Sequence, residues 1–156
     1  LPIDHKGRII FRMSVNPQEI IRKVEFGTSS LKDRINALNK MCDAGYRVGM
    51  LIAPVVMVDN WNKLYSDLID QLSDELSQKV KNQLFIEVIF MTYSYVHCAI
   101  NRDAFPNAME LYDKTVMTGR GRGKYRYRDD VRAKAEEFLR EQLSHKLKGI
   151  PIAYIV

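Results

Sequence analysis

Three apolar segments predict the strands that organise most of the chain. Residues 9–15 alternate between apolar and polar positions, as in a strand with one buried face. Residues 48–53 and 84–91 are nearly continuous apolar runs, which are typical of parallel strands buried on both faces. A shorter apolar run at 152–156 predicts a closing strand at the end of the sequence.

The helical patterns lie between these strands and after them. Apolar residues recur there every three or four positions, as in helices with one buried stripe. The predicted helices span about 16–24, 30–45, 60–76, 106–112 and 130–147. Strands that alternate with helices form parallel β-α units, so the expected class is α/β. The three main strands would make half a barrel or a small open sheet, and we expect the chain to be a single unit.

The first strand ends in polar residues that share one face. Arg12 and Ser14 lie opposite its apolar face, and Asn16 continues the same alternation. Polar side chains at the C-terminal end of a strand suit a barrel lumen or a ligand cleft. Asn16 also stands directly before Pro17, which predicts a helix N-cap followed by proline at the first helical position.

Glu87 is a carboxylate inside an otherwise apolar strand. A buried charge without a partner is unfavourable, so Glu87 needs a partner. A salt bridge with Arg12 and contact with a ligand are both open interpretations. Tyr93 and Tyr95 follow this strand, at the end where β/α folds place their sites.

The excess positive charge of the chain lies in one basic arm, residues 114–128. Of the 24 Lys and Arg in the chain, six lie in this arm, which leaves 18 against 19 Asp and Glu elsewhere. Glycines and tyrosines alternate with the cations, so an extended strand or hairpin would put the cations on one face and offer rings that stack on bases. The pattern favours a nucleic acid as partner. The alternative is a solvated hairpin whose charged edge discourages strand pairing.

The composition fits one globular domain. The chain has 156 residues, of which 46% are hydrophobic, enough for a substantial core. Two cysteines do not make a disulfide framework, which favours a reducing cytoplasm, and no apolar run is long enough to span a bilayer. The sequence opens with Leu1 rather than Met, and we therefore expect it to be a piece of a longer protein.

Neither cysteine predicts an intrinsic metal site. Cys42 lies on the apolar stripe of a predicted helix and is expected in the core. His97 and Cys98 are adjacent, but neighbours on an extended segment point to opposite sides. No second Cys/His pair stands at the spacing that a zinc site needs.

An ordered set of short motifs resembles the spore photoproduct lyase family. They are FRMSVNP at 11–17, VEFGTS at 24–29, AGY at 44–46, LIAP at 51–54, IFMTY at 89–93, MTGRGRGKY at 117–125 and YIV at 154–156. The matches keep the family's order over nearly the whole chain, from about residue 8.

The resemblance implies radical chemistry on damaged DNA. In this family a [4Fe-4S] cluster, fed by an external electron donor, reduces S-adenosylmethionine to give a 5′-deoxyadenosyl radical. The radical starts the reversal of 5-thyminyl-5,6-dihydrothymine to two thymines in the cytoplasm of the spore. The protein mainly places and shields such cofactors. A thymine dimer inside a duplex must be flipped out to be reached. The full-length enzyme is expected to be a monomer.

The chain departs from the family pattern at the cluster. The C-x-x-x-C-x-x-C motif is absent, and the family's hydrogen-donor cysteine lies upstream of the matched region. Two cysteines cannot supply the three ligands that such a cluster takes from protein. The resemblance therefore implies the C-terminal half of a partial (β/α) barrel of the radical S-adenosylmethionine type, at about 8–100. A basic β-hairpin and a C-terminal helix would follow at about 101–156, and the piece alone is expected to be inactive.

The family's site residues fall on two parts of the chain. Contacts to S-adenosylmethionine are implied at Ser14, Asn16 and Ala53, and DNA contacts near the flipped lesion at Arg120, Arg122, Lys124 and Tyr125. From the residues alone, the alternative is a non-catalytic α/β module that binds nucleic acid through the basic arm.

Overall fold

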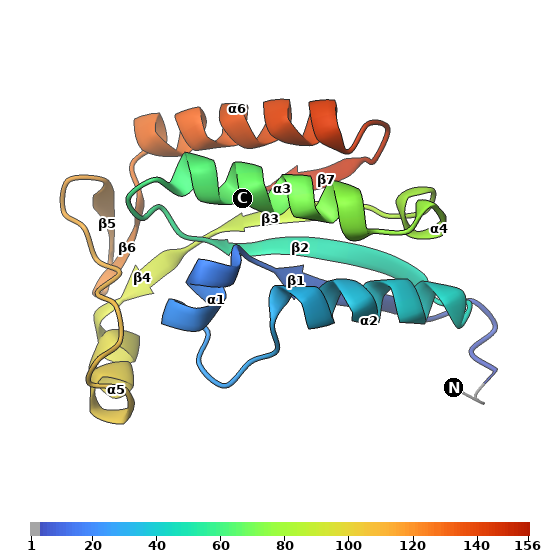
Figure 1. Ribbon diagram of the computed structural model, residues 1–156. Coiled ribbons are helices and arrows are strands. Elements are labelled where there is room, and N and C mark those ends of the chain that lie inside the picture. The colour runs from blue at the N-terminus through green and yellow to red at the C-terminus, as the bar shows by residue number, and fades with distance from the viewer. Residues whose placement is uncertain (1–3) are drawn as a thin grey trace.

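A four-stranded parallel sheet forms the centre of the computed structural model, which describes residues 4–156 (Figure 1). The strands are β1 (Ile10–Val15), β2 (Arg47–Val55), β3 (Ile86–Phe90) and β7 (Ile152–Ile155), and they lie in that order. All three neighbouring pairs are parallel. The predicted α/β class and its three main parallel strands are therefore confirmed.

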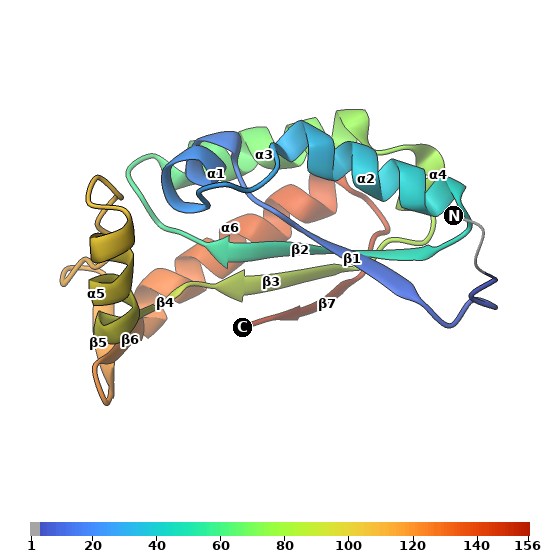
Figure 2. The same cartoon turned by 90° about the horizontal axis from the view of Figure 1, so that it is seen from below.

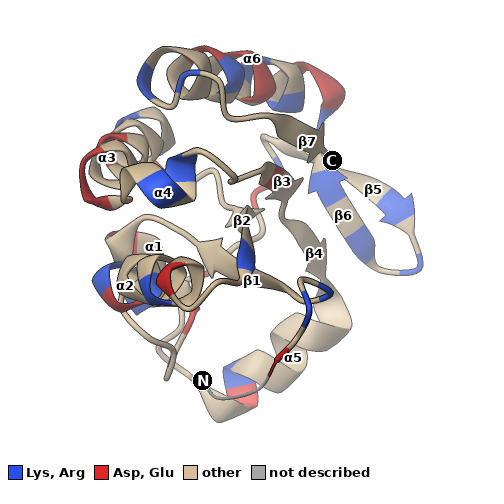
Figure 3. Ribbon diagram, turned by 90° about the vertical axis from the view of Figure 1, so that its right-hand side faces the viewer, with Lys and Arg blue, Asp and Glu red and all other residues tan. Residues whose placement is uncertain are grey.

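Helices cover one face of this sheet and leave the other face open (Figures 2 and 3). They are α1 (Gln18–Val24), α2 (Leu31–Asp43), α3 (Trp61–Glu75), α4 (Gln78–Lys81) and α6 (Asp129–Lys146). Side chains on the covered face, such as Val48, Met50 and Val88, are fully buried. On the open face, by contrast, Ile10 remains 39% exposed.

The core forms where the helical stripes meet the sheet. On α2, the buried residues Leu31, Ile35, Leu38 and Cys42 recur at helical spacing, so Cys42 is a core residue as predicted. Ser30 caps this helix by accepting a hydrogen bond from the backbone N–H of Asp33 at 3.2 Å.

A smaller antiparallel sheet stands at the C-terminal end of the main sheet. Its order is β4 (Thr92–Ser94), β6 (Lys124–Tyr127) and β5 (Met117–Gly121). Helix α5 (Tyr95–Ala104) follows β4 directly. In Figure 1, β5, β6 and α5 together border the end at which the parallel strands finish.

The prediction of a helix at 106–112 was wrong. The helix of this region forms earlier in the chain, as α5. Proline has no backbone N–H and disfavours helical conformation in the residue before it, so Pro106 ends α5 instead of starting a helix. His97 and Cys98 consequently lie on a helix and not on an extended segment.

Two predicted helix starts also differ from the structure. Asn16 does not cap α1: Pro17 occupies the N-cap position, and the Asn16 side chain bonds elsewhere. Asn60 stands at the start of α3 but has left-handed backbone and makes no side-chain cap. The single helix predicted at 60–76 is followed by the separate short helix α4, which Ser77 caps. Within residues 4–156, no helix has the length and apolar character needed to cross a membrane.

Candidate functional site

The C-terminal ends of the parallel strands lie together and carry the predicted strand-end residues. Ser14 and Ala53 stand at the ends of β1 and β2. The backbone N–H of Met91, just after β3, donates to the carbonyl of Val55 at 3.0 Å, which joins the ends of β2 and β3. Ser14 is exposed, whereas Ala53 is half-buried. This edge therefore offers one free hydroxyl and adjacent backbone groups to a ligand.

Asn16 lies at the same edge, but its amide is engaged by protein groups. The residue is 0% exposed. Its Nδ2 donates to Glu25 Oε1 at 2.8 Å and to the Pro54 carbonyl at 2.9 Å. Its Oδ1 accepts from the Tyr65 hydroxyl at 3.0 Å. Asn16 thus ties the end of β1 to the end of β2.

A polar group on the open face joins β1, β3 and β7. Arg12 donates to Glu87 through Nε, at 2.9 Å, and through Nη2. Glu87 pairs in register with Tyr154. The hydrogen bonds from Arg12 are the main reason that the pKa of Glu87 lies below its ordinary value, and burial opposes them. The predicted salt bridge between Arg12 and Glu87 is confirmed.

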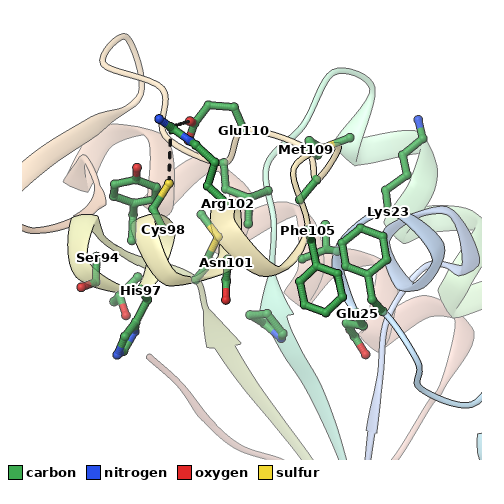
Figure 4. A pocket seen from close by; sticks show the side chains of 18 of the residues that line it. Lys23, Glu25, Ser94, His97, Cys98, Asn101, Arg102, Phe105, Met109 and Glu110 are labelled. Carbon is green, nitrogen blue, oxygen red and sulfur yellow. Dashed lines mark hydrogen bonds and ion pairs between the residues drawn. The ribbon is translucent and has the colours of Figure 1, made fainter.

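A cavity of about 480 Å³ lies beyond the ends of β2 and β3 (Figure 4). Glu25, Phe26 and Pro54 line one side of it, and residues of β4 and α5 line the other. Phe26 stacks on Phe105 with ring centroids 5.0 Å apart. The volume of the cavity and its lining of polar and apolar side chains suit a small molecule or part of one.

Charged and sulfur groups meet on the α5 side of the cavity. Arg102 Nη2 lies 3.3 Å from Glu110 Oε2 and 3.8 Å from Cys98 Sγ. Figure 4 shows the three side chains on the same side of the cavity. Burial is the main reason that the pKa of Tyr93 is raised, and a hydrogen bond with Cys98 adds to the effect.

A tyrosine cluster joins this wall to the basic arm. Tyr93, Tyr95, Tyr112 and Tyr125 pack on one another with ring centroids 4.8–6.2 Å apart. The Tyr95 backbone N–H also donates to the carbonyl of Gly123 at 3.1 Å. Tyr125 is half-buried, and these contacts hold β6 against β4 and the start of α5 as far as the turn of the arm.

The arm is an antiparallel pair, β5 and β6, joined by a tight turn. Gly121, Arg122 and Gly123 all have positive φ, a conformation that glycine adopts without strain. The strict alternation predicted for the cations is interrupted at this turn. On β6, Lys124 and Arg126 lie on one face, and Tyr125 and Tyr127 lie on the other, where Tyr127 is buried.

Five of the six cations of the arm, all except Lys114, lie on or beside the hairpin and fall into two classes. Arg126 pairs with Asp129 and Arg128 with Asp130, both at the start of α6. Arg120, Arg122 and Lys124 are exposed and make no ion pair within residues 4–156. Basic residues on both strands are visible in Figure 3. The outer part of the arm therefore presents three unpaired cations that can bind phosphates.

The part of the chain that the structure describes contains no metal site. No group of three or more His, Cys, Asp and Glu is placed to hold an ion. Cys42 is in the core and Cys98 lies on α5, and both are free thiols. The residues present therefore do not fit a [4Fe-4S] cluster.

The sequence patterns did not identify three residues that hold the strand ends together. Arg34, only 3% exposed, pairs with Glu25 at 2.7 Å, and Tyr65 completes the bonds to Asn16. One signal was available: Arg34 interrupts the apolar stripe of α2, three residues after Leu31. The position of Glu25, on a loop, carried no comparable signal.

Comparison with known proteins gives a consistent result along the whole chain. The family model described as spore photoproduct lyase matches residues 1–156. The spore photoproduct lyase of Clostridium acetobutylicum is 30% identical over 100% of this chain and 47% of its own length. That of Bacillus subtilis is 32% identical over 92% of this chain and 42% of its own length. The chain thus spans about half the length of the curated relatives it matches.

Solved structures agree with these relatives. A spore photoproduct lyase mutant with bound AdoMet and dinucleoside spore photoproduct superimposes with a TM-score of 0.88 at 28% identity. A spore photoproduct lyase complexed with dinucleoside spore photoproduct gives 0.89 at the same identity. Each match covers 97% of this chain and 46% of the solved chain.

Proposed function

The chain belongs to the spore photoproduct lyase family, and from this we propose that it is the C-terminal half of a DNA repair lyase. The enzyme would revert the spore photoproduct, 5-thyminyl-5,6-dihydrothymine, to two thymines. The observation that carries the proposal is the likeness of the chain to a structure that holds both AdoMet and the dinucleoside lesion. The open face of the sheet would line the lumen of a partial barrel in which these ligands meet.

We assign the S-adenosylmethionine contacts of this chain to the strand ends. Ser14 offers an exposed hydroxyl and Ala53 a backbone group at the same edge. Asn16 would serve the site by holding the carbonyl of Pro54, next to Ala53. When bound, S-adenosylmethionine supplies the radical that begins the reaction. The residues of this chain bind it, orient it and exclude water from it.

The cluster that reduces S-adenosylmethionine would be held outside this chain. Neither Cys42 nor Cys98 lies at the strand ends, and each stands on a different helix. The proposal therefore requires cluster-binding cysteines in an upstream segment of the full-length protein. Its test must be made on that protein.

The outer part of the basic arm would bind the DNA backbone. Arg120, Arg122 and Lys124 are exposed cations, without an ion pair among residues 4–156, on the hairpin that borders the proposed cofactor edge in Figure 1. Phosphate contacts of this kind position a duplex without reading its sequence. Tyr125 would act from within the tyrosine cluster by setting the pose of the arm.

Turnover of the dinucleoside lesion tests the proposal. The full-length protein, prepared without oxygen and with its cluster reconstituted, is mixed with a reductant, S-adenosylmethionine and dinucleoside spore photoproduct. Chromatography should show the repaired dinucleoside. DNA binding without S-adenosylmethionine binding or repair would contradict the proposal and would instead support a non-catalytic nucleic-acid-binding module.

A further inference from the structure

Arg34 is a buried charge whose donors all serve the C-terminal end of the sheet. It projects from α2 and is 3% exposed. Its Nη1 donates to the carbonyl of Ser14 at 3.3 Å, and its Nε donates to the carbonyl of Ser29 at 3.0 Å. Its Nη2 lies 2.7 Å from both Glu25 Oε2 and Thr28 Oγ1. One side chain thus holds the end of β1 and the loop that follows α1.

The network continues from Arg34 to the end of β2. Glu25 accepts from Arg34 on one oxygen and from Asn16 on the other. Asn16 donates in turn to the carbonyl of Pro54. Tyr65 donates to Asn16 and accepts from the backbone N–H of Val56 at 2.8 Å. No buried side-chain polar atom of the described residues lacks a partner, so the network is complete.

These side chains act where the backbone ladder ends. The β1–β2 ladder extends to the pair Val15 and Ile52. Between Ile52 and Val55 the register of β2 against β3 is irregular. Ser14 therefore lies in the next-to-last pair of this ladder, opposite Leu51, whereas Ala53 lies beyond it, where regular strand pairing no longer fixes the backbone. The network based on Arg34 supplies the missing connection.

Stability alone does not explain this arrangement. Burial of an ion pair costs desolvation energy, and apolar replacements of similar volume are often neutral or stabilising. A buried ion pair in a network that joins two strand ends instead holds those ends in one relative position. That geometry is the spacing between the hydroxyl of Ser14 and the backbone of Ala53.

We infer that Arg34, acting through Glu25 and Asn16, is a positioning residue for the S-adenosylmethionine edge. It holds Ser14 and the segment 53–54 at the separation that the cofactor requires, without touching the cofactor. The inference rests on the proposed cofactor-binding role of Ser14 and Ala53.

The test removes the buried pair without leaving an unpaired charge. In the full-length protein, Arg34→Met is combined with Glu25→Gln, because Gln can still accept from Asn16. Equilibrium dialysis then measures the affinity for S-adenosylmethionine, and fluorescence anisotropy measures DNA affinity. We expect S-adenosylmethionine binding to weaken about tenfold, the lower end of what loss of a supporting residue costs at metal sites. DNA affinity should stay close to that of the parent protein, whereas the melting temperature should fall, because Met cannot donate to the carbonyls of Ser14 and Ser29.

Asn39→Leu is the matched control. Asn39 lies on the same helix, α2, and its side chain bonds to Glu75 and Ser77, away from the strand ends. This variant should lose stability but keep its affinity for S-adenosylmethionine. A fall in affinity that equals that of the double variant would overturn the inference.

Each further outcome is decisive. A folded double variant with full S-adenosylmethionine affinity overturns the inference and leaves the proposed function standing. If the double variant does not fold, Arg34→Lys decides instead, since it keeps the charge opposite Glu25 but loses the donor to Ser14. Reduced affinity in that variant supports the inference, and unchanged affinity overturns it. A parent protein that does not bind S-adenosylmethionine rejects the proposed function itself.

Discussion

At the scale of single residues, Glu87 places a negative charge at the centre of the sheet. Glu87 is 5% exposed, and hydrogen bonds from Arg12 stabilise the charged form of its carboxyl group. Those bonds lower the pKa of the carboxyl below its ordinary value of 4.5. Between its folded and unfolded pKa values, the folded protein binds fewer protons than the unfolded chain. The free energy of unfolding therefore falls as the pH drops through this window.

Replacement of the Glu87 carboxyl should make the free energy of unfolding depend less on pH in the acid range. Glu87→Gln cannot titrate, so its unfolding free energy should vary less as the pH falls below the ordinary carboxyl pKa of 4.5, although it should be less stable at neutral pH. Urea unfolding at several pH values measures both effects. Glu136→Gln is the control, because Glu136 forms a surface pair with Arg140 on α6 and should change little. Parent-like pH dependence in Glu87→Gln would contradict the assignment.

Ser14 gives a second residue-level prediction. Its exposed hydroxyl can contribute one hydrogen bond to the cofactor, which is worth about 0.5–1.5 kcal/mol. In the full-length protein, Ser14→Ala should therefore weaken S-adenosylmethionine binding by about two- to tenfold. Ser144→Ala, on the exposed side of α6, should leave the affinity unchanged. Equal affinities in the two variants would remove Ser14 from the site.

The neighbouring Asn16 marks a limit of strand alternation. The period of two correctly put Arg12 and Ser14 on the open face, because both lie within β1. Asn16 lies one residue beyond the end of that strand, where the alternation no longer applies. Its direction is set by Glu25 and Pro54, which belong to other segments, nine and 38 residues away. Such partners cannot be identified from a local pattern.

At the scale of elements, periodicity predicted the long elements well and the junctions poorly. Strands β1, β2 and β3 and helices α2, α3 and α6 bury apolar residues in a pattern that the local sequence displays. Helix α5 buries no residue completely, so it lacks that signal. It was therefore predicted some ten residues too late. The tyrosine cluster that holds it against β6 joins segments from 93 to 125 and is visible only in three dimensions.

The basic arm supports an element-level prediction about salt. Each phosphate contact releases counterions, so three contacts contribute roughly 2–3 units to the log–log slope of DNA affinity against salt. Replacement of Arg120, Arg122 and Lys124 by alanine should remove this part of the slope. Affinity should fall on damaged and undamaged duplexes alike, because phosphate contacts carry no sequence information.

The paired cations of the same arm provide the control. Arg126→Ala and Arg128→Ala remove side chains that Asp129 and Asp130 already neutralise. Their combined effect on the slope should be smaller than that of the outer three. A triple variant with full affinity and an unchanged slope would identify the arm as a solvated hairpin.

At the scale of the whole molecule, the sheet has one covered face and one open face. The helices bury the side that carries Val48 and Met50, and the opposite side carries Arg12, Ser14 and the pair at Glu87. This asymmetry is what the proposed half-barrel would require. The α/β fold class of the protein could be predicted from the order of strands and helices. The cavity and the strand-end network could not, because they depend on packing between distant segments.

The open face should make the isolated chain self-associate. Strand β1 is an edge of the sheet, and Ile10 at its start and Ile9 just before it are 39% and 48% exposed. Exposed apolar edges invite pairing between copies, and a charge on the edge opposes it. Sedimentation velocity on the 156-residue chain should therefore show concentration-dependent association that Ile10→Lys reduces. Ala133→Lys, on the exposed side of α6, adds the same charge far from the edge and should leave association unchanged. A parent chain that stays monomeric at all concentrations would show that this edge needs no cover, and would count against the half-barrel proposal.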